Sequence, residues 1–406
     1  MKIGVISKNY AAKRLILGKI KDATYINLRF LNFYLFSNAH LWFLRAIGKL
    51  NMTQEEQASI LFFRFKMPFY RYCDILHFFN TINYSYKNLW VISVESGVPW
   101  TLDVANCIGK PDIDFSSLKE KPEILKALKY LAAPNCKALL TLSECSRNIQ
   151  LAILKQFPDY ELIIKKKLFT LHPPQKLIIN SIENKKVNFS NDQLKFIYIG
   201  RDFFRKGGRE TINSLSIYKD AFDFKLIIIS DLRIDEPKYL LEEDEVEKTK
   251  NTIVANSSWI EYYSMLPNEQ VIQLIKKAHV ALLPTWMETY GYSVLECQAC
   301  GCPVISTSLR ALKEINNHNV GWLIDVPVNS LDNPIHNTKE EIQVFRDKLE
   351  FGLSQKLYHV LTHREEIMEK AENCIERIRI NHNPQTYCEE LLKAYNGCLQ
   401  NDFDSF

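Results

Sequence analysis

Short apolar runs alternate with longer amphipathic stretches along the whole chain. Apolar runs of strand length that stop at glycine, proline or a polar residue predict buried strands, and apolar residues spaced three or four apart predict helices between them. This alternation favours a parallel sheet with helical crossovers in each half, and hence an α/β fold. The predicted strands are residues 2–7, 73–79, 89–94 and 136–143 in the first half, and 194–200, 224–230, 279–284 and 303–306 in the second.

Chain length and composition agree with two domains. A chain of 406 residues exceeds what one core usually organises, and a hydrophobic content of 47% is enough to fill two cores. The polar stretch at residues 180–192 is the best linker candidate. We therefore predict a first domain over residues 1–190 and a second over residues 191–383, with a C-terminal helix in residues 384–406 that packs back on the first domain.

The small net charge of +4 hides an uneven distribution of charge. Residues 1–190 hold 27 Lys and Arg against 14 Asp and Glu, a balance of +13, whereas the remainder holds 24 against 33, a balance of −9. A basic first half indicates an anionic partner, such as a membrane surface or a lipid diphosphate. Attraction between the two domains is the alternative explanation, and nothing in the sequence indicates a nucleic-acid partner.

One segment of the first half is a candidate for contact with a membrane. Residues 27–50 are rich in Phe, Leu and Trp, carry three basic residues and contain no acid, and Lys165–Lys167 form a second basic cluster. A helix of this kind could lie on an anionic bilayer, although an apolar, aromatic helix is more often packed in the core. No uninterrupted apolar stretch reaches 18 residues, so we expect no membrane span.

The segment 284–304 carries the most informative pattern, because Glu288 and Glu296 flank an aromatic and glycine turn. An apolar strand ends at Pro284, which places Glu288 on the loop that leaves its carboxyl end. The helical pattern begins at Tyr292, so Glu296 lies about one turn into the helix. Free N–H groups at this helix start favour an anion such as phosphate, and the two carboxylates would accept hydrogen bonds from sugar and ribose hydroxyls. Alternatively, both glutamates only complement the helix dipole.

A second segment, 194–208, reads as a buried strand that ends at Gly200 and is followed by Arg201, Arg205 and Lys206 before a helix. Arg201 and Lys206, as two cations at the carboxyl end of a strand, suit a diphosphate. Considered alone, Arg205 and Lys206 would be a solvated basic turn.

The order of these elements resembles the carboxyl-terminal domain of the retaining glycosyltransferases of family 4, also described as glycosyl transferases group 1. The motifs that carry the resemblance run from the GR and KG pairs at 200–207 through the E-x7-E spacing and the G-x-PVI run to Glu314. This resemblance implies the GT-B fold, in which two Rossmann-like domains with parallel sheets face each other across a cleft. It also implies a nucleotide-diphospho-sugar donor and a saccharide or lipid-linked saccharide acceptor, in the biosynthesis of a cell-surface glycan.

The resemblance also implies roles for individual residues. Arg201 and Lys206 would bind the donor diphosphate, Glu288 would hold the donor sugar, and Glu296 would bind the ribose. The backbone amides that follow Glu288 would complete the donor site, over the residues Thr289, Tyr290, Gly291, Tyr292 and Ser293.

The first domain would bind the acceptor, but its motifs are less regular. Glu95 stands where many relatives carry a histidine, and His77 lies inside a predicted strand, which is typical of a packed residue. We name both as candidate acceptor-side residues.

Transfer of this class needs no metal if fixed positive charges neutralise the departing diphosphate, so we expect no cofactor and no metal site. Two alternatives stay open: a nucleotide-sugar epimerase or hydrolase on the same scaffold, and a non-catalytic relative that binds nucleotide-sugars.

Ten cysteines could suggest metal or disulfide chemistry. Cys297, Cys300 and Cys302 resemble a cluster-binding run, but they fall in the helix beside Glu296 and its exit, where small buried residues are expected. The first strand begins at the N-terminus and Lys8 follows at once, which is unlike a signal peptide. We therefore expect reduced thiols and a cytoplasmic protein, with membrane contact at most peripheral, at the inner face of a membrane.

Overall fold

A computed structural model describes residues 1–6, 10–28, 64–65, 72–234, 239 and 242–399. Most of the segment proposed for membrane contact, from residue 29 to residue 50, lies outside the described residues. Asn27 at its start belongs to a strand, and Leu28 is buried. No helix within the described ranges combines the length and the apolar character that crossing a bilayer requires.

The chain divides into two compact units, each with its own parallel sheet. The first unit comprises Met1–Pro174 and Pro384–Phe406, and the second comprises Gln175–Asn383. The division falls before the expected linker at 180–192, because the backbone N–H groups of Gln175 and Ile178 already donate to His382 and Ala299 of the second unit. Lys185 inside that polar stretch is buried, and its Nζ donates to the carbonyls of Ile275 and Cys300. The linker prediction was therefore wrong, since these residues are tied into the second unit.

The first unit contains a six-stranded sheet in the order β2-β1-β4-β6-β7-β8. All of its strand pairs are parallel. Its strands are β1 (Lys2–Val5), β2 (Thr24–Asn27), β4 (Ile75–Phe79), β6 (Trp90–Val94), β7 (Cys136–Thr141) and β8 (Leu168–Thr170), with a separate short pair, β3 (Arg64–Phe65) and β5 (Ile82–Asn83). Its helices are α1 (Tyr10–Leu15), α4 (Leu102–Ile108), α5 (Pro122–Ala132), α6 (Glu144–Leu154), α7 (Pro158–Lys165) and α15 (Pro384–Asn396), with the 3-10 turn η1 (Ser116–Glu120).

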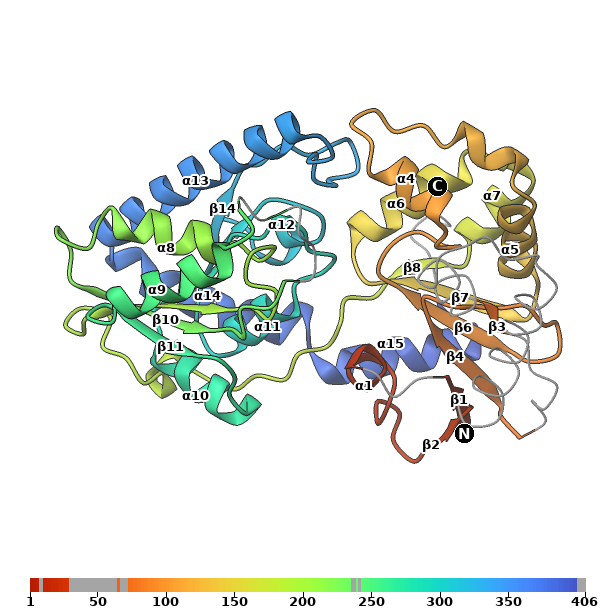
Figure 1. Cartoon of the computed structure of the whole chain (residues 1–406). Helices are drawn as coiled ribbons and strands as arrows, with labels where there is room; N and C mark the ends of the chain where they lie inside the picture. Colours follow the sequence, from red (N-terminus) through yellow and green to blue (C-terminus); the bar gives the residue numbers. More distant parts are fainter. Residues whose placement is uncertain (7–9, 29–63, 66–71, 235–238, 240–241, 400–406) are drawn as a thin grey trace. The chain divides into compact units, whose positions relative to one another are not determined.

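The second unit contains another six-stranded parallel sheet, in the order β11-β10-β9-β12-β13-β14. Its strands are β9 (Leu194–Ile199), β10 (Phe224–Ile229), β11 (Ile260–Tyr263), β12 (Val280–Leu283), β13 (Val304–Thr307) and β14 (Gly321–Ile324). Its helices are α8 (Gly208–Ser216), α9 (Glu245–Ala255), α10 (Asn268–Lys277), α11 (Tyr292–Ala299), α12 (Leu312–Ile315), α13 (Lys339–Thr362) and α14 (Glu365–Asn381), with the 3-10 turn η2 (Ile182–Asn184). Helices cover both faces of this sheet, with α8 and α13 packed together on one of them (Figure 1).

All eight strands predicted from apolar runs are present, so the α/β prediction with a parallel sheet in each half is confirmed. The strands that the pattern missed are mostly at sheet edges, where β2, β8, β11 and β14 lie. Edge strands are shorter and more exposed on one side, which weakens their apolar signal. In β11, for example, only Ile260 is buried.

The C-terminal helix α15 packs on β6 and β7 of the first unit. Tyr395 on this helix is buried, and its hydroxyl lies 2.7 Å from Nδ1 of His77 on β4. The other ring nitrogen of His77 lies 2.9 Å from Ser93 Oγ on the neighbouring strand β6. His77 therefore ties the last helix to the centre of the sheet and, with no exposed surface, offers nothing to an acceptor.

Two buried histidines should make folding sensitive to mild acid. Burial lowers the pKa of His77 from 6.5 to about 3, and burial, together with the charge of Arg364, lowers the pKa of His279 to about 4. Below pH 6.5 these two histidines bind protons in the unfolded chain but stay neutral in the folded chain. The free energy of unfolding therefore decreases as the pH falls from about 6.5 toward 4.

We predict that moving from pH 7 to pH 5 costs about 2 kcal/mol of unfolding free energy for each of these histidines. Urea unfolding at the two pH values measures the cost. His77→Gln should lower stability at pH 7 but remove most of that pH-dependent part for the first unit. His318→Gln, a change at an exposed histidine, is the control and should leave the pH dependence intact. An unchanged pH dependence in His77→Gln would contradict the assignment.

Candidate functional site

The candidate site lies where the strand order of the second sheet reverses direction. Successive strands are added outward from β9 through β10 to β11, and the chain then returns to place β12 on the other side of β9. In open parallel sheets such a switch point leaves a crevice outside the carboxyl ends of its two strands, and ligands bind there. The two loops whose motifs predict a ligand site are the ones that follow β9 and β12.

The first loop runs from Gly200 to Gly207. Gly200 N–H donates to Ile229 on the adjacent strand β10, which fixes the start of the loop against the sheet. Arg201 is exposed, and among the described residues its side chain has no hydrogen-bond or ion-pair partner. Its guanidinium is therefore available to a ligand.

The second loop runs from Pro284 to Gly291 and is joined to the first by several hydrogen bonds. The carbonyl of Arg205 accepts from Trp286 N–H at 2.9 Å and from the Thr285 hydroxyl at 3.2 Å. In return, Nη1 of Arg205 donates to the carbonyl of Met287 at 2.8 Å, while its Nε donates to Asp202 at 2.6 Å. The two loops thus form one connected structure.

Arg205 is the site residue whose role the sequence did not indicate. A basic dipeptide on a turn is usually solvated, and that interpretation was wrong for this arginine. The sequence gives no signal for the hydrogen bond of Arg205 to Met287, because the acceptor is a backbone carbonyl that any residue would supply.

Lys206 of the first loop and Glu288 of the second form an ion pair. Each side chain keeps 16% of its surface exposed, so the pair is reachable from solvent but largely desolvated. Burial alone would raise the pKa of Glu288, but the charge and hydrogen bond of Lys206, aided by Arg205, outweigh it and hold this pKa below its usual value. Glu288 is therefore an ionised acceptor at neutral pH, and it is further fixed by the N–H of Thr289 at 3.1 Å.

Helix α11 begins at the end of the second loop, with Gly291 as its N-cap. Gly291 has a φ of +100°, and a Cβ there would come within 2.6 Å of Leu312, so the position requires glycine. A glycine cap offers no side chain to the first N–H groups of the helix, which makes this helix start suitable for an anion. Tyr292 and Ser293 lie in the first turn and are partly exposed, whereas Tyr290 is buried against the ring of Tyr292.

Glu296 lies on α11 in the second turn and is partly exposed. The helix ends at Ala299, and Gly301, which has a φ of +58°, and Pro303 follow it. Cys297, Cys300 and Cys302 are buried free thiols, as expected from their place on the helix and its exit.

The first unit places Glu95 at the carboxyl end of β6, beside Asn80 at the carboxyl end of β4. The two residues pair reciprocally: Asn80 Nδ2 donates to Glu95 Oε1 at 3.1 Å, and Glu95 N–H donates to Asn80 Oδ1 at 3.1 Å. Asn80 has a φ of +53°, a left-handed conformation that is uncommon outside glycine and marks positions worth a functional hypothesis. Glu95 is partly exposed at this edge of the sheet.

The basic cluster Lys165–Lys167 is not one continuous surface. Lys165 pairs with Glu161 at 2.5 Å. Lys167 directs its Nζ to the last carbonyls of α5, those of Leu131, Ala132 and Ala133, at 2.7–3.2 Å. Lys167 therefore caps a helix, and the expectation that all three lysines present their charge to a membrane was wrong for this one.

We predict that Gly207→Ala disrupts the joined loops. Gly207 has a φ of +77°, and a Cβ there would lie 1.9 Å from the carbonyl oxygen of Pro284, so backbone would have to move. Gly18→Ala is the control, because Gly18 has a φ of +71° but no atom within 4 Å of an added Cβ. Gly18→Ala should cost only about 1–2 kcal/mol of backbone strain, measured by urea unfolding. An equally small cost for Gly207→Ala would show that the loops do not depend on this contact.

Part of the second unit matches a family of known proteins. Residues 180–338, which contain both loops, match the family model of glycosyl transferases group 1. The capsular polysaccharide biosynthesis glycosyltransferase CapM of Staphylococcus aureus is 26% identical over 229 residues, which cover 54% of this chain and 50% of CapM. The chain thus spans about half the length of this curated relative.

Solved structures show the same fold at low sequence identity. A glycosyltransferase from Rickettsia africae ESF-5 superposes with a TM-score of 0.56 at 14% identity, covering 98% of this chain and 90% of that one. The structure described as trehalose-6-phosphate from E. coli, bound with UDP-2-fluoro glucose, gives a TM-score of 0.55 at 12% identity and covers 99% and 100% of the two chains. The fold is therefore that of GT-B glycosyltransferases, and residues 180–338 carry the sequence signature of glycosyl transferases group 1.

Proposed function

We propose that this protein is a retaining glycosyltransferase of the family-4 type, which transfers a hexose from a nucleotide-diphospho-sugar to a saccharide or lipid-linked saccharide. The observation that carries the proposal is the contact of Lys206 with Glu288 beside the start of α11. A cation, a carboxylate and a helix start at a switch point combine the groups that a diphosphate and a sugar hydroxyl require.

Each group has a distinct task in this proposal. Arg201 and Lys206 bind the diphosphate and stabilise the charge that develops as it departs, together with the N–H groups from Tyr290 to Ser293. Glu288 accepts hydrogen bonds from hydroxyls of the donor sugar, and Glu296 accepts them from the ribose. Because these fixed charges stabilise the leaving group, the proposed transfer is metal-independent. The acceptor would attack on the face from which the diphosphate leaves, which needs no protein nucleophile.

The ion pair also holds the two ligand-binding groups next to each other. Lys206 has three N–H donors and Glu288 has two carboxylate oxygens, so each can bind a diphosphate or a sugar hydroxyl while it keeps its contact with the other.

The nucleoside is expected at the same edge of the second sheet. Trp259 precedes the first residue of β11 and is buried, so it lies at the amino end of this strand, away from the loops. Met265 follows the carboxyl end of β11 and is 70% exposed. The backbone around Met265 is the better candidate for contacts with the base.

Relatives guide the choice of pathway and donor. CapM acts in capsular polysaccharide biosynthesis, which supports a role in making a surface glycan. The neighbour bound with UDP-2-fluoro glucose supports a uridine nucleotide as the first donor to test.

Peripheral contact with an anionic membrane is a further part of the proposal. Leu162 and Ile163 on α7 are exposed by 66% and 46%, and Lys165 and Lys166 follow them. The first unit, residues 1–174 and 384–406, holds 25 basic and 17 acidic residues, a balance of +8, which would favour such a surface.

Thermal shift with UDP-glucose, UDP-galactose, UDP-N-acetylglucosamine and GDP-mannose tests the proposed function. A donor at a hundred times its dissociation constant should add about 2.7 kcal/mol of stability, and that shift should disappear in Arg201→Ala and Lys206→Ala. Turnover in these variants should fall by a factor on the order of 10². Incubation with donor alone separates the alternatives, because an epimerase forms a new sugar nucleotide without an acceptor. No stabilisation by any nucleotide-sugar would refute the proposal.

The two glutamates should respond differently to removal of their charge. Glu288→Gln frees Lys206 from its partner, so UDP should bind as tightly as to the wild type or more tightly, while turnover of the sugar donor falls. Glu296→Gln should weaken the binding of UDP itself, since the ribose loses its acceptor. Isothermal titration with UDP and steady-state kinetics measure both effects. Equal losses of UDP affinity in the two variants would contradict this division of roles.

A further inference from the structure

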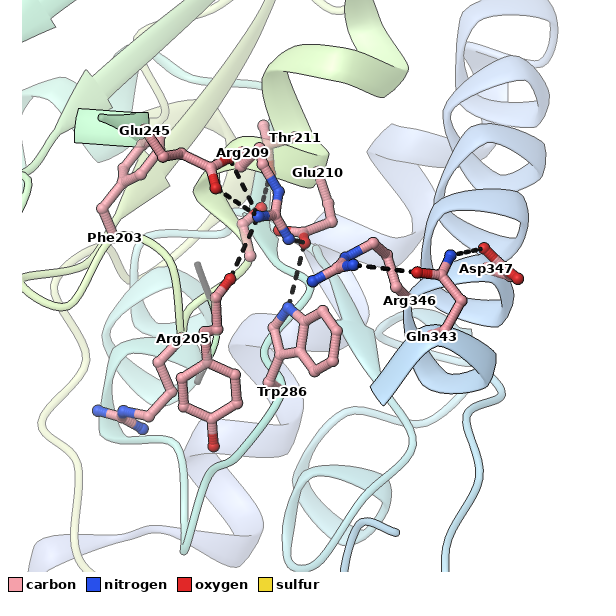
Figure 2. A network of polar contacts seen from close by, with 12 residues as sticks. Phe203, Arg205, Arg209, Glu210, Thr211, Glu245, Trp286, Gln343, Arg346 and Asp347 are labelled. Carbon is pink, nitrogen blue, oxygen red and sulfur yellow. Dashed lines mark hydrogen bonds and ion pairs between the residues drawn. The ribbon is translucent and has the colours of Figure 1, made fainter. Parts of the chain in front are cut away.

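A network of buried charged side chains lies directly beneath the two site loops (Figure 2). It joins the first turn of α8 to α9, α13 and the second loop, and none of its members was singled out by the sequence. The members are Arg209, Glu210, Glu245, Trp286 and Arg346, with Gln343 and Asp347 at its outer end.

Glu210 is at the centre of this network and has no exposed surface. Its Oε1 accepts from Nη2 of Arg209 and from the indole Nε1 of Trp286, the latter at 3.2 Å. Nη1 of Arg209 donates in turn to both carboxylate oxygens of Glu245, at 3.1 and 3.2 Å, and to the carbonyl of Tyr239. Glu210 is therefore fixed from both sides, and through Trp286 it reaches the second loop.

Trp286 is equally constrained. Its ring stacks on Phe345 with centroids 4.8 Å apart and an angle of 23° between the planes, and the guanidinium of Arg346 lies 5.4 Å from the centroid. Its backbone N–H donates to Arg205 of the first loop, and Glu288 lies two residues further along. A shift of the Trp286 side chain would therefore move Glu288.

A buried charged network is a costly way to fill this space. Replacing a buried ion pair by well-packed apolar residues of similar volume often leaves a protein as stable or makes it more stable. We therefore look for a role of these charges other than stability. Hydrogen bonds differ from apolar contacts in that they fix direction as well as distance. The bond from Trp286 to Glu210 fixes the rotation of the indole, and with it the course of the second loop.

We propose that Glu210 is a positioning residue for the donor site, which acts through the indole N–H of Trp286 to hold Glu288 in place for the donor sugar. This inference rests on the proposed function, because the geometry that it protects is that of the sugar contacts. Neither Glu210 nor Trp286 touches the substrate in this scheme.

Trp286→Phe is the decisive variant, since it keeps the ring between Phe345 and Arg346 and removes only the second ring with its N–H. Trp322→Phe is the matched control: Trp322 is also buried in the second unit, and its indole nitrogen has no hydrogen-bond partner among the described residues. Both variants should lose similar stability in urea. Only Trp286→Phe should lose turnover of the sugar nucleotide, by ten- to a hundredfold, as a small misplacement of reacting groups does. Its affinity for UDP should stay within about twofold of the wild type, because UDP does not use Glu288.

The role of Glu210 is tested by replacing its carboxylate, which is the acceptor for the indole N–H of Trp286. Glu210→Gln keeps an oxygen for Trp286 and should retain most of the turnover, whereas Glu210→Met removes the acceptor and should match Trp286→Phe. Combining Glu210→Met with Trp286→Phe should lower turnover no further than either change alone, since both break the same bond.

The outcomes separate the inference from the proposed function. Equal turnover in Trp286→Phe and Trp322→Phe, or additive losses in the double variant, overturns the positioning role while wild-type activity stands. A parallel loss of turnover and UDP affinity in Trp286→Phe shows a merely structural role and also overturns it. A wild type that binds no UDP and turns over no nucleotide-sugar removes the proposed function, and the positioning role with it.

Discussion

The close approach of two loop backbones at the switch point of the second sheet is the constraint on which the site depends. Gly207 leaves no room for a side chain against the carbonyl of Pro284, and the carbonyl of Arg205 accepts two hydrogen bonds from the other loop. Only this approach brings Lys206 within reach of Glu288. The parallel strands β9 and β12 supply the frame, because neighbouring carboxyl ends in a parallel sheet open at the same edge.

Charge is arranged around this contact in two layers. The outer layer consists of Arg201, which is exposed, and the ion pair of Lys206 and Glu288, which is partly exposed and can be reached by a ligand. The inner layer is the buried network of Arg209 and Glu210, whose partners are fixed by packing. A rigid support beneath a few exchangeable contacts is the arrangement that accurate positioning of a reacting group requires.

In the first unit, the buried histidine His77 has a structural role. His77 accepts or donates through both ring nitrogens within the sheet and α15, so a residue type often associated with catalysis here joins the last helix to the first sheet. Glu95 and Asn80 instead occupy the carboxyl edge of neighbouring strands, with the unusual backbone of Asn80 held by their reciprocal hydrogen bonds. Of the two acceptor-side candidates, the structure leaves Glu95 accessible and encloses His77.

The sequence by itself determined the elements that depend on local pattern. Apolar runs located all the central strands of the two sheets, because the burial of a strand depends on consecutive apolar residues. The order of motifs also indicated Arg201, Lys206, Glu288 and Glu296 as a set.

Only the tertiary structure decided which strands are neighbours and which distant residues meet. β9 pairs with β12, although many residues separate them in the chain. The hydrogen bond of Arg205 to the Met287 carbonyl joins positions 82 residues apart, and the bond between Trp286 and Glu210 joins positions 76 residues apart. Such contacts depend on long-range packing and on main-chain atoms common to all residues, so no local pattern can encode them.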